Sequence, residues 1–489
     1  MTGRSAALQL VLALSFCHVA LAQHTGTFSP IGNMIIPARA GHTATLLPDG
    51  KVLIAGGTEY GWTLSFAELY DPSTGSFTAA GNMTTARSGH MASLLPDGKV
   101  LIAGGSCFGV HGECTFRGSL ASAELYDPAT GTFAATGNMA TASSKQLPIL
   151  LNDGKVLINE VDSGGSPDVA ELYDPVTGTF SRTGDALVKF AETATLLPDG
   201  RVLFVSECGT DQLYDPVSGT FSLTNKPARI GCDGFAAAAL TDGTVLVAGG
   251  YNDTGGYNPA AELYAPSSGS FRPTGNMTNK RYNHTATLLP DGTVLIAGGS
   301  DDSPLQQAAA SAEIYDPASG TFSRTGDMTG AHSEHMATLL LDGRVLLTGG
   351  YTPGPHPAIP EVYTPSVLIP VPVVGAVRFD RTVVTAGSTY SVNLSGSNLA
   401  PDMFFDVRFS SPESNESAVA LNWQQGFVAN HDVPAGLASG SWTITGVRAH
   451  EIETDHTGIF FPVSATITVS PLVPSIQIFS DHGKAPQPH

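Results

Sequence analysis

Apolar and polar positions recur along this chain in a unit of about fifty residues. The clearest copies are RAGHTATLLPDGKVLIAGG at Arg39–Gly57 and LLPDGKVLIAGG at Leu94–Gly105. HTATLL predicts a first strand, and the PDG that follows has the residues that a tight hairpin turn needs. KVLIAGG is a continuous apolar run, which predicts a second strand that is buried on both faces.

The unit continues with two more short elements. AELYDP predicts a third strand that ends at its proline, and a Gly-[Ser/Thr]-Phe element begins the fourth. The Asp-Gly turn occurs seven times, with successive spacings of 48, 56, 46, 43, 49 and 51 residues. Its aspartates are Asp49, Asp97, Asp153, Asp199, Asp242, Asp291 and Asp342. Four short strands in each of seven such units predict a seven-bladed β-propeller.

The order of the elements also predicts how the ring closes. The first Gly-Thr-Phe, at Gly26–Phe28, precedes every Asp-Gly turn, whereas the last unit has Tyr363 but no Gly-x-Phe after it. We therefore expect the N-terminal segment near Thr25–Ile31 to supply the outer strand of the seventh blade. That strand would leave no orphan edge in the ring.

The pattern changes after Tyr363. TPSVLIPVPVVG is a Pro-rich linker, and alternating stretches such as TYSVNL at Thr389–Leu394 follow it. This alternation predicts an immunoglobulin-like β-sandwich over residues 366–470. The segment 471–489 is expected to be a flexible tail.

These motifs resemble known families. LLPDGKVLIAGG, AELYDP and GTF, over residues 23–365, resemble the kelch repeat in the form found in the central domain of galactose oxidase-like proteins. VNLSGSNL resembles IPT/TIG immunoglobulin-like domains, and its place after the propeller is similar to that of the galactose oxidase C-terminal domain. The resemblance implies an all-β fold with a seven-bladed kelch-type propeller. It implies little about function, because such propellers serve many roles.

The net charge limits the possible binding partners, and the N-terminal sequence indicates where the protein is located. The 489 residues include 23 Lys and Arg against 43 Asp and Glu, a net charge of -20, which argues against nucleic acids and anionic membranes. Residues 1–22 have the Arg4 start, apolar run and small-residue end of a signal peptide, with cleavage after Ala22. We expect a secreted or extracytoplasmic monomer without a membrane span.

Four cysteines follow the signal segment: Cys107, Cys114, Cys208 and Cys232. An even number in a secreted chain favours disulfides, and four cysteines allow three pairings. The repeat places Cys208 and Cys232 on one face of adjacent blades, which favours a bond between them. Cys107 and Cys114 would then close the long loop of the second blade, both bonds being structural.

Candidate ligand residues come from equivalent positions of the seven units. The residue seven places before each turn aspartate belongs to a ring at the expected channel mouth: His42, His90, Gln146, Glu192, Phe235, His284 and His335. Three residues earlier, a second ring reads Arg39, Arg87, Ser143, Lys189, Cys232, Arg281 and His332. Such a mouth suits an anionic or hydroxyl-rich ligand, or a metal held by His284, His335 and His42.

A structural role for the repeated residues is the favoured alternative. Four near-identical histidines are expected to bond backbone groups of neighbouring blades, so the deviant Gln146, Glu192 and Phe235 are more distinctive. The repeated glutamate of AELYDP is expected to lock strands together rather than to act in catalysis. Loops on the same face carry aromatic side chains suited to stacking on sugars: Tyr60, Trp62, Tyr251 and Tyr257.

The expected function is that of a secreted, non-catalytic binding protein for a carbohydrate or an extracellular protein, with no metal or cofactor. One alternative, from the resemblance to galactose oxidase, is a copper radical oxidase. That resemblance implies two tyrosines, two histidines and a cysteine cross-link, yet the match at Arg281–His284 displaces the tyrosine or puts Asn283 in its slot, and Val407–Ser414 has no histidine. The chain is therefore expected not to be an enzyme. Another alternative is a structural cell-surface module.

Overall fold

The computed structural model describes residues 25–369 except 109–117, 145, 161–168, 188–190, 207–210, 226, 228–229, 232, 253–255, 301–307 and 353–357. Beyond residue 369 it describes the backbone of ten strands, β35 to β44. The signal segment and three of the four cysteines expected to form disulfides, Cys114, Cys208 and Cys232, lie outside the described residues. Cys107 is disulfide-bonded. No helix long and apolar enough to cross a membrane occurs in the described part of the chain.

The described residues form strands and turns without any helix, so the all-β prediction is confirmed. The first repeat sheet has the order β3 (Thr43–Leu46), β4 (Val52–Ala55), β7 (Phe66–Asp71) and β8 (Ser76–Asn82). All its neighbours are antiparallel, as the short turns between them require. Six further sheets repeat this order.

These sheets, numbered along the chain, have the following strands. The second contains β9 (Met91–Leu94), β10 (Val100–Ala103), β13 (Ala123–Asp127) and β14 (Thr132–Ala135). The third contains β15 (Gln146–Leu150), β16 (Val156–Glu160), β17 (Val169–Asp174) and β18 (Thr179–Asp185). The fourth contains β19 (Ala191–Leu196), β20 (Val202–Ser206), β21 (Gln212–Asp215) and β22 (Thr220–Leu223). The fifth contains β23 (Asp233–Ala239), β24 (Val245–Asn252), β26 (Ala261–Ala265), β27 (Ser270–Pro273) and the added β25 (Gly256–Tyr257). The sixth contains β28 (Thr285–Leu288), β29 (Val294–Ala297), β30 (Ala312–Asp316) and β31 (Thr321–Arg324).

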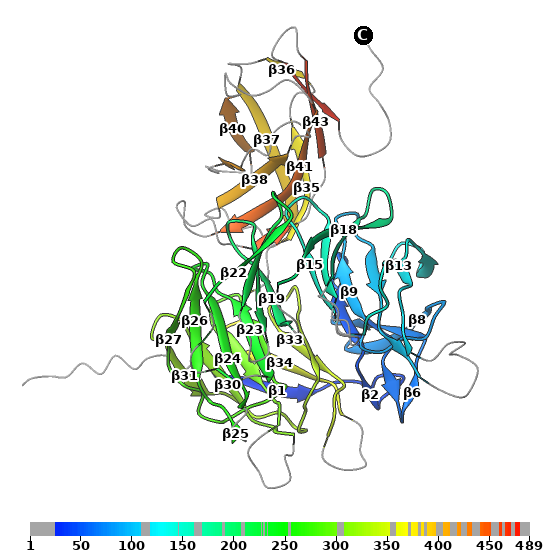
Figure 1. Cartoon of the computed structure of the whole chain (residues 1–489), viewed down its shortest axis with the longest axis vertical. Coiled ribbons are helices and arrows are strands. Elements are labelled where there is room, and N and C mark those ends of the chain that lie inside the picture. Colours follow the sequence, from blue (N-terminus) through cyan, green and yellow to red (C-terminus); the bar gives the residue numbers. More distant parts are fainter. Residues whose placement is uncertain are drawn as a thin grey trace, which may run out of the picture.

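The seventh sheet joins the two ends of the repeat region. It contains β32 (Met336–Leu339), β33 (Val345–Thr348), β34 (Glu361–Pro365) and, as its outer strand, β1 (Gly26–Pro30). Phe28 lies opposite Tyr363 in this pairing, and their rings are 4.9 Å apart. The first strands of successive sheets are neighbours, and β32 also neighbours β3 (Figure 1). The expected closure by the N-terminal strand is therefore present.

The repeated turn and second strand explain the packing between sheets. Asp49 accepts a hydrogen bond from the Lys51 amide at 3.1 Å, and Gly50 has a φ of 85°, as the hairpin requires. The second strand of the first sheet, Val52–Ala55, is completely buried. Its side chains contribute to apolar clusters shared with neighbouring sheets, such as the one that includes Leu53, Val100 and Tyr126. Each inter-sheet core therefore contains side chains from two repeats.

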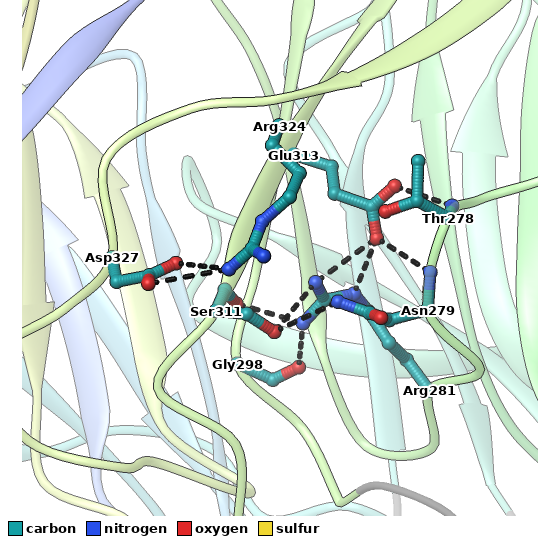
Figure 2. A network of polar contacts seen from close by, with 8 residues as sticks. All are labelled: Thr278, Asn279, Arg281, Gly298, Ser311, Glu313, Arg324 and Asp327. Carbon is teal, nitrogen blue, oxygen red and sulfur yellow. Dashed lines mark hydrogen bonds and ion pairs between the residues drawn. The ribbon is translucent and has the colours of Figure 1, made fainter.

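In the first, second, sixth and seventh sheets, a buried glutamate of the third strand locks the sheet to the segment that leads into it. Glu313 forms an ion pair with Arg281 at 3.0 Å and accepts hydrogen bonds from the Thr278 and Asn279 amides (Figure 2). Arg39–Glu68 and Arg87–Glu124 are equivalent pairs at 2.9 and 2.8 Å. In the seventh sheet, a histidine replaces the arginine, and His332 lies 3.3 Å from Glu361. The structural role expected for the repeated glutamate is confirmed.

Smaller sheets lie on the loops of the first two repeats. β2 (Arg39–Ala40), β5 (Thr58–Glu59) and β6 (Trp62–Thr63) form one, and β11 (Ser106–Cys107) pairs with β12 (Gly118–Ser119). The β5–β6 hairpin contacts the second repeat, because the Thr63 amide donates to the Phe108 carbonyl at 3.2 Å.

The C-terminal strands form two further sheets. β35 (Val373–Phe379), β37 (Thr389–Ser397) and β40 (Val428–Asp432) make one. The other runs β36 (Val383–Thr385), β44 (Ser475–Phe479), β43 (Ala465–Ser470), β41 (Ser441–His450), β38 (Phe404–Ser410) and β39 (Ala418–Leu421), with β42 (Ile459–Phe461) beside β41. Figure 1 shows them as a group apart from the ring. β44, with the sequence SIQIF, lies inside the segment that was expected to be a flexible tail. It pairs with both β43 and β36. The immunoglobulin-like and IPT/TIG assignments stay predictions.

Because the Arg281–Glu313 ion pair is buried, breaking it should change the free energy of unfolding far more than breaking an exposed ion pair. We expect Arg281→Met to lower the free energy of unfolding by about 3–5 kcal/mol, because it leaves the Glu313 carboxylate buried without its cation. Asp185→Ala is the control, since it breaks the exposed Arg182–Asp185 pair and should cost less than about 1 kcal/mol. Denaturant unfolding measures both values. Equal losses would contradict the role given to the lock.

Candidate functional site

The predicted ring histidines are buried between sheets. His42, His90, His284 and His335 are between 3% and 6% exposed. His90 Nε2 lies 3.1 Å from the Thr43 hydroxyl, and His335 Nε2 lies 3.1 Å from that of Thr285. Each of these threonines begins the first strand of the preceding sheet. The histidines therefore join neighbouring sheets through side-chain hydroxyls, whereas backbone groups were expected.

The other two ring histidines show how the repeat accommodates changes. Met336 stands in the seventh sheet where the first and sixth sheets have this threonine, and His42 Nε2 instead lies 3.0 Å from Thr348 on the second strand. In the fifth sheet the equivalent residue is Ala236. His284 accordingly has no threonine partner, and its ring lies against the Ala248 backbone of the fifth sheet, a group of the kind expected for these histidines.

Burial keeps these imidazoles neutral. It lowers the pKa of His42, His284 and His335 to about 3, and nearby arginine or histidine side chains add to the shift. The pKa of His90 is also well below its ordinary value, mainly because of burial. These residues therefore form neutral hydrogen-bonding groups at neutral pH.

The second ring lies deeper. Arg39, Arg87 and Arg281 are completely buried in the glutamate locks described above. Among the deviant positions, Glu192 is half-buried and Phe235 is buried. Gln146 begins β15, its side chain lying outside the described part, and Lys189 is also outside it. Ligand binding by these ring residues stays a prediction.

The residue just before each ring histidine lies at an inner rim where neighbouring sheets meet. Gly41 and Gly89 have positive φ angles of 64° and 60°, and the Gly89 amide donates to the Gly41 carbonyl at 2.8 Å. Gly234 repeats this conformation before Phe235. Asn283 and Glu334 occupy the same position in the sixth and seventh sheets, each with a φ of 55°. We call Gly41, Gly89, Gly234, Asn283 and Glu334 the inner rim.

The two rim residues with side chains contact each other across adjacent sheets. Asn283 Nδ2 donates to Glu334 Oε1 at 3.1 Å, and the Glu334 amide donates to the Asn283 carbonyl at 3.2 Å. Asn283 is half-buried and Glu334 is exposed. The two predicted rings, at His335 and His332, lie one and two residues away from Glu334 in the sequence, so this pair was not predicted. The feature of the sequence that could have indicated it is the replacement of Gly41 and Gly89 by Asn283 and Glu334 at the position just before the ring histidine.

A tyrosine cluster lies beside the rim on the fifth and sixth sheets. The ring of Tyr257 stacks on Tyr282 at 5.7 Å, and Tyr251 meets both edge-on. The Tyr282 hydroxyl donates to Asp233 Oδ2 at 3.0 Å. Burial, helped by the Asp233 carboxylate, raises the pKa of Tyr282 to about 12. The structure thus brings the predicted Tyr251 and Tyr257 together with two residues that were not predicted, Tyr282 and Asp233.

The other predicted aromatics lie on the β5–β6 hairpin of the first repeat. Tyr60 is 77% exposed at its tip, with a φ of 48°, and Trp62 is 40% exposed. The exposed Phe108 of the second repeat joins the same surface through its bonds to Thr63. The predicted aromatic residues therefore lie in two places, one around the exposed Tyr60 and one around Tyr251, whereas Tyr257, which was expected at the surface, is buried.

The described residues do not assemble a copper donor set of two histidines and two tyrosines. His42, His90 and His335 direct Nε2 at threonine hydroxyls, and the Tyr282 hydroxyl donates to a carboxylate. Within the described residues no three histidine, cysteine or acidic side chains are grouped so that they would hold a metal ion. These donors therefore do not fit copper in this conformation.

Comparison with known proteins identifies a structural neighbour. No family model matches the chain, and no curated protein matches it. Among solved structures, it is similar to a fungal alcohol oxidase described as having catalytic diversity among the AA5 family, in complex with copper. The TM-score is 0.62 and the identity is 19%, over 90% of this chain and 99% of that one.

This likeness supports a fold of the galactose oxidase-like kind. The finer kelch assignment stays a prediction. At 19% identity the neighbour establishes the fold and leaves the activity to be proposed.

The buried neutral histidines predict acid-sensitive folding. Their pKa values are about 3 in the folded chain and about 6.5 when unfolded, so the unfolded chain binds more protons between these values. The free energy of unfolding should therefore fall as the pH drops below about 6.5. The pKa of Glu361 is lowered, which adds to this trend, whereas that of Glu68 is raised and opposes it.

His284→Gln provides the specific test, because His284 has no threonine bond to lose. Between pH 6.5 and 5, we expect the variant to reduce the slope by up to about 1.4 kcal/mol per pH unit, one proton's worth. Denaturant unfolding across this range measures the slope. An unchanged slope would show that His284 is not neutral in the folded chain.

Proposed function

We propose that this protein binds a carbohydrate at the propeller face that carries the inner rim and the aromatic surfaces, without catalysing a reaction. The observation that supports this most is the combination of aromatic rings and hydrogen-bonding groups at one place. The ring of Tyr251 meets that of Tyr282, which bonds Asp233, and the Asn283–Glu334 pair lies next to Tyr282, whereas Tyr257 is buried behind them. Aromatic faces stack on the apolar faces of sugars, while carboxylates and amides bond their hydroxyls.

The β5–β6 hairpin supports the same proposal. Tyr60 and Trp62 remain exposed although burial of such rings is favourable, and Phe108 extends the surface. The net charge of -20 argues for a neutral ligand over an anionic one. Secretion through the signal segment would place this face where extracellular glycans occur.

A copper radical oxidase is the second candidate, favoured by the fungal alcohol oxidase neighbour. Copper, if bound, would supply one-electron chemistry. Cys232, outside the described residues, directly precedes Asp233 and thus lies next in sequence to the partner of Tyr282. His42, His90 and His335 would have to turn away from their threonine partners to offer Nε2 as a ligand, which is why this candidate ranks second.

A glycan array tests the carbohydrate proposal. We expect the wild type to bind at least one neutral glycan, and Trp62→Ala or Tyr251→Ala to weaken that binding about tenfold through lost stacking. Val176→Ala is the matched control, because Val176 is 92% exposed on an outer turn and its loss should change nothing. Binding that survives both aromatic substitutions would move the site away from this face.

Metal analysis tests the oxidase candidate. For protein purified and then incubated with copper, the carbohydrate proposal predicts less than stoichiometric copper after dialysis and no thioether-linked Tyr–Cys peptide by mass spectrometry. Stoichiometric copper together with that cross-link would instead establish the oxidase constellation. Tyr282→Phe, which should leave any weak surface copper unchanged, serves as the control variant.

A further inference from the structure

The hairpin of the first repeat has a strained and exposed tyrosine at its tip. Tyr60 and Gly61 join β5 to β6, and their φ angles are positive, 48° and 83°. A type I′ turn requires positive φ at both residues and favours asparagine followed by glycine. Tyrosine is strained in this conformation, and its ring is 77% exposed, so little packing offsets the strain. Strained residues of this kind are concentrated at sites of function.

Two further exposed rings are held beside this tip. Trp62 on β6 is 40% exposed, and Phe108 of the second repeat is 53% exposed. The Phe108 amide donates to Thr63 Oγ1 at 2.9 Å, and the Thr63 amide donates to the Phe108 carbonyl at 3.2 Å. On the other side, β5 pairs with β2, whose Arg39 is buried in a glutamate lock. We call Tyr60, Trp62 and Phe108 the aromatic platform.

The position of the platform indicates the size of its ligand. Figure 1 shows β2 and β6 projecting from the ring of sheets. Sites for small molecules are concave and enclose most of their ligand, which rings on a projecting hairpin cannot do for a single sugar. The platform therefore suits a flat ligand that is larger than itself. Because its backbone is fixed by hydrogen bonds, binding would cost little conformational entropy.

Size and chemistry favour a polysaccharide over a protein as this ligand. One side of a standard protein interface contains about 20–30 residues, and arginine is enriched there. The platform consists of three aromatic side chains, and the arginine of its small sheet, Arg39, is buried. A polymer with a repeating face gains strength from many weak contacts, so a few rings are enough. The net charge of -20 disfavours an acidic polymer.

We propose that the aromatic platform binds the flat face of a neutral, β-1,4-linked polysaccharide. In such a polymer the chain is a flat ribbon, and the apolar C–H faces of its sugars can stack on aromatic rings. This inference rests on the proposed carbohydrate function and names its substrate class, an extended polymer. The strain at Tyr60 is then the consequence of placing a ring where the turn favours asparagine.

The test measures retention of the full chain on cellulose powder, and stability by the thermal unfolding midpoint. Tyr60→Asn removes the ring and supplies the residue that a type I′ turn favours. We expect this variant to bind cellulose about tenfold more weakly, with a midpoint equal to or above that of the wild type. Phe108→Ala should weaken binding to a similar extent. Val217→Asn is the matched control, because Val217 is 71% exposed on an outer turn of the fourth sheet.

The outcomes separate this inference from the proposed function. Full cellulose binding by both Tyr60→Asn and Phe108→Ala would overturn the role of the platform and leave carbohydrate binding intact. So would a wild type that binds soluble glycans on the array but not cellulose, or one that binds granular starch, whose α-linked chains coil, equally well. A lower midpoint in Tyr60→Asn would make Tyr60 structural and also overturn the inference. If the wild type binds neither array glycans nor cellulose, both proposals fail together.

Discussion

The frame of the ring depends on a buried ion pair between the glutamate of the third strand and the arginine before the first strand, which the first, second and sixth sheets form. A propeller sheet must be joined to the next one by a chain that crosses from an outer to an inner strand. The backbone amides of that crossing have no partner in either sheet and would be costly to bury alone. Glu313 satisfies the Thr278 and Asn279 amides while Arg281 neutralises its charge. Repetition of this lock gives the ring a stable frame whose inner surface can vary.

Variation on that surface follows from the same frame. Histidine–threonine bonds between first strands are built from neutral groups, so burial costs less than it would for charges. Where one partner is lost, another position supplies the hydroxyl, as Thr348 does for His42. The inner rim lies just outside this layer, and only there do the sixth and seventh sheets place polar side chains in a glycine conformation. Construction and recognition thus occupy adjacent residues of one motif.

Much of the fold could be predicted from the sequence because its signals are local. Within one repeat, the strands and hairpins follow from the PDG turns and the apolar VLIA runs. Ring closure follows from the GTF that precedes the first Asp-Gly turn. The role of the repeated glutamate could also be inferred, since a residue present in nearly every unit serves the unit. β44 was missed because its alternation is short and its pairing with β36 joins residues far apart in the chain. The Tyr282–Asp233 bond and the Asn283–Glu334 pair were missed because both join different sheets, and backbone strain at Glu334 leaves no trace in composition.

The propeller thus contains repeated residues that build it, beside a face around Tyr251 and Tyr282 for which we propose carbohydrate binding without a metal. A crystal structure of the protein soaked with a neutral oligosaccharide and with copper, recorded with anomalous scattering, tests this most directly. We expect saccharide density against the Tyr251 ring and no anomalous peak among the ring histidines. An anomalous peak bound by His284, His335 or Tyr282, with no saccharide at the rim, would contradict it.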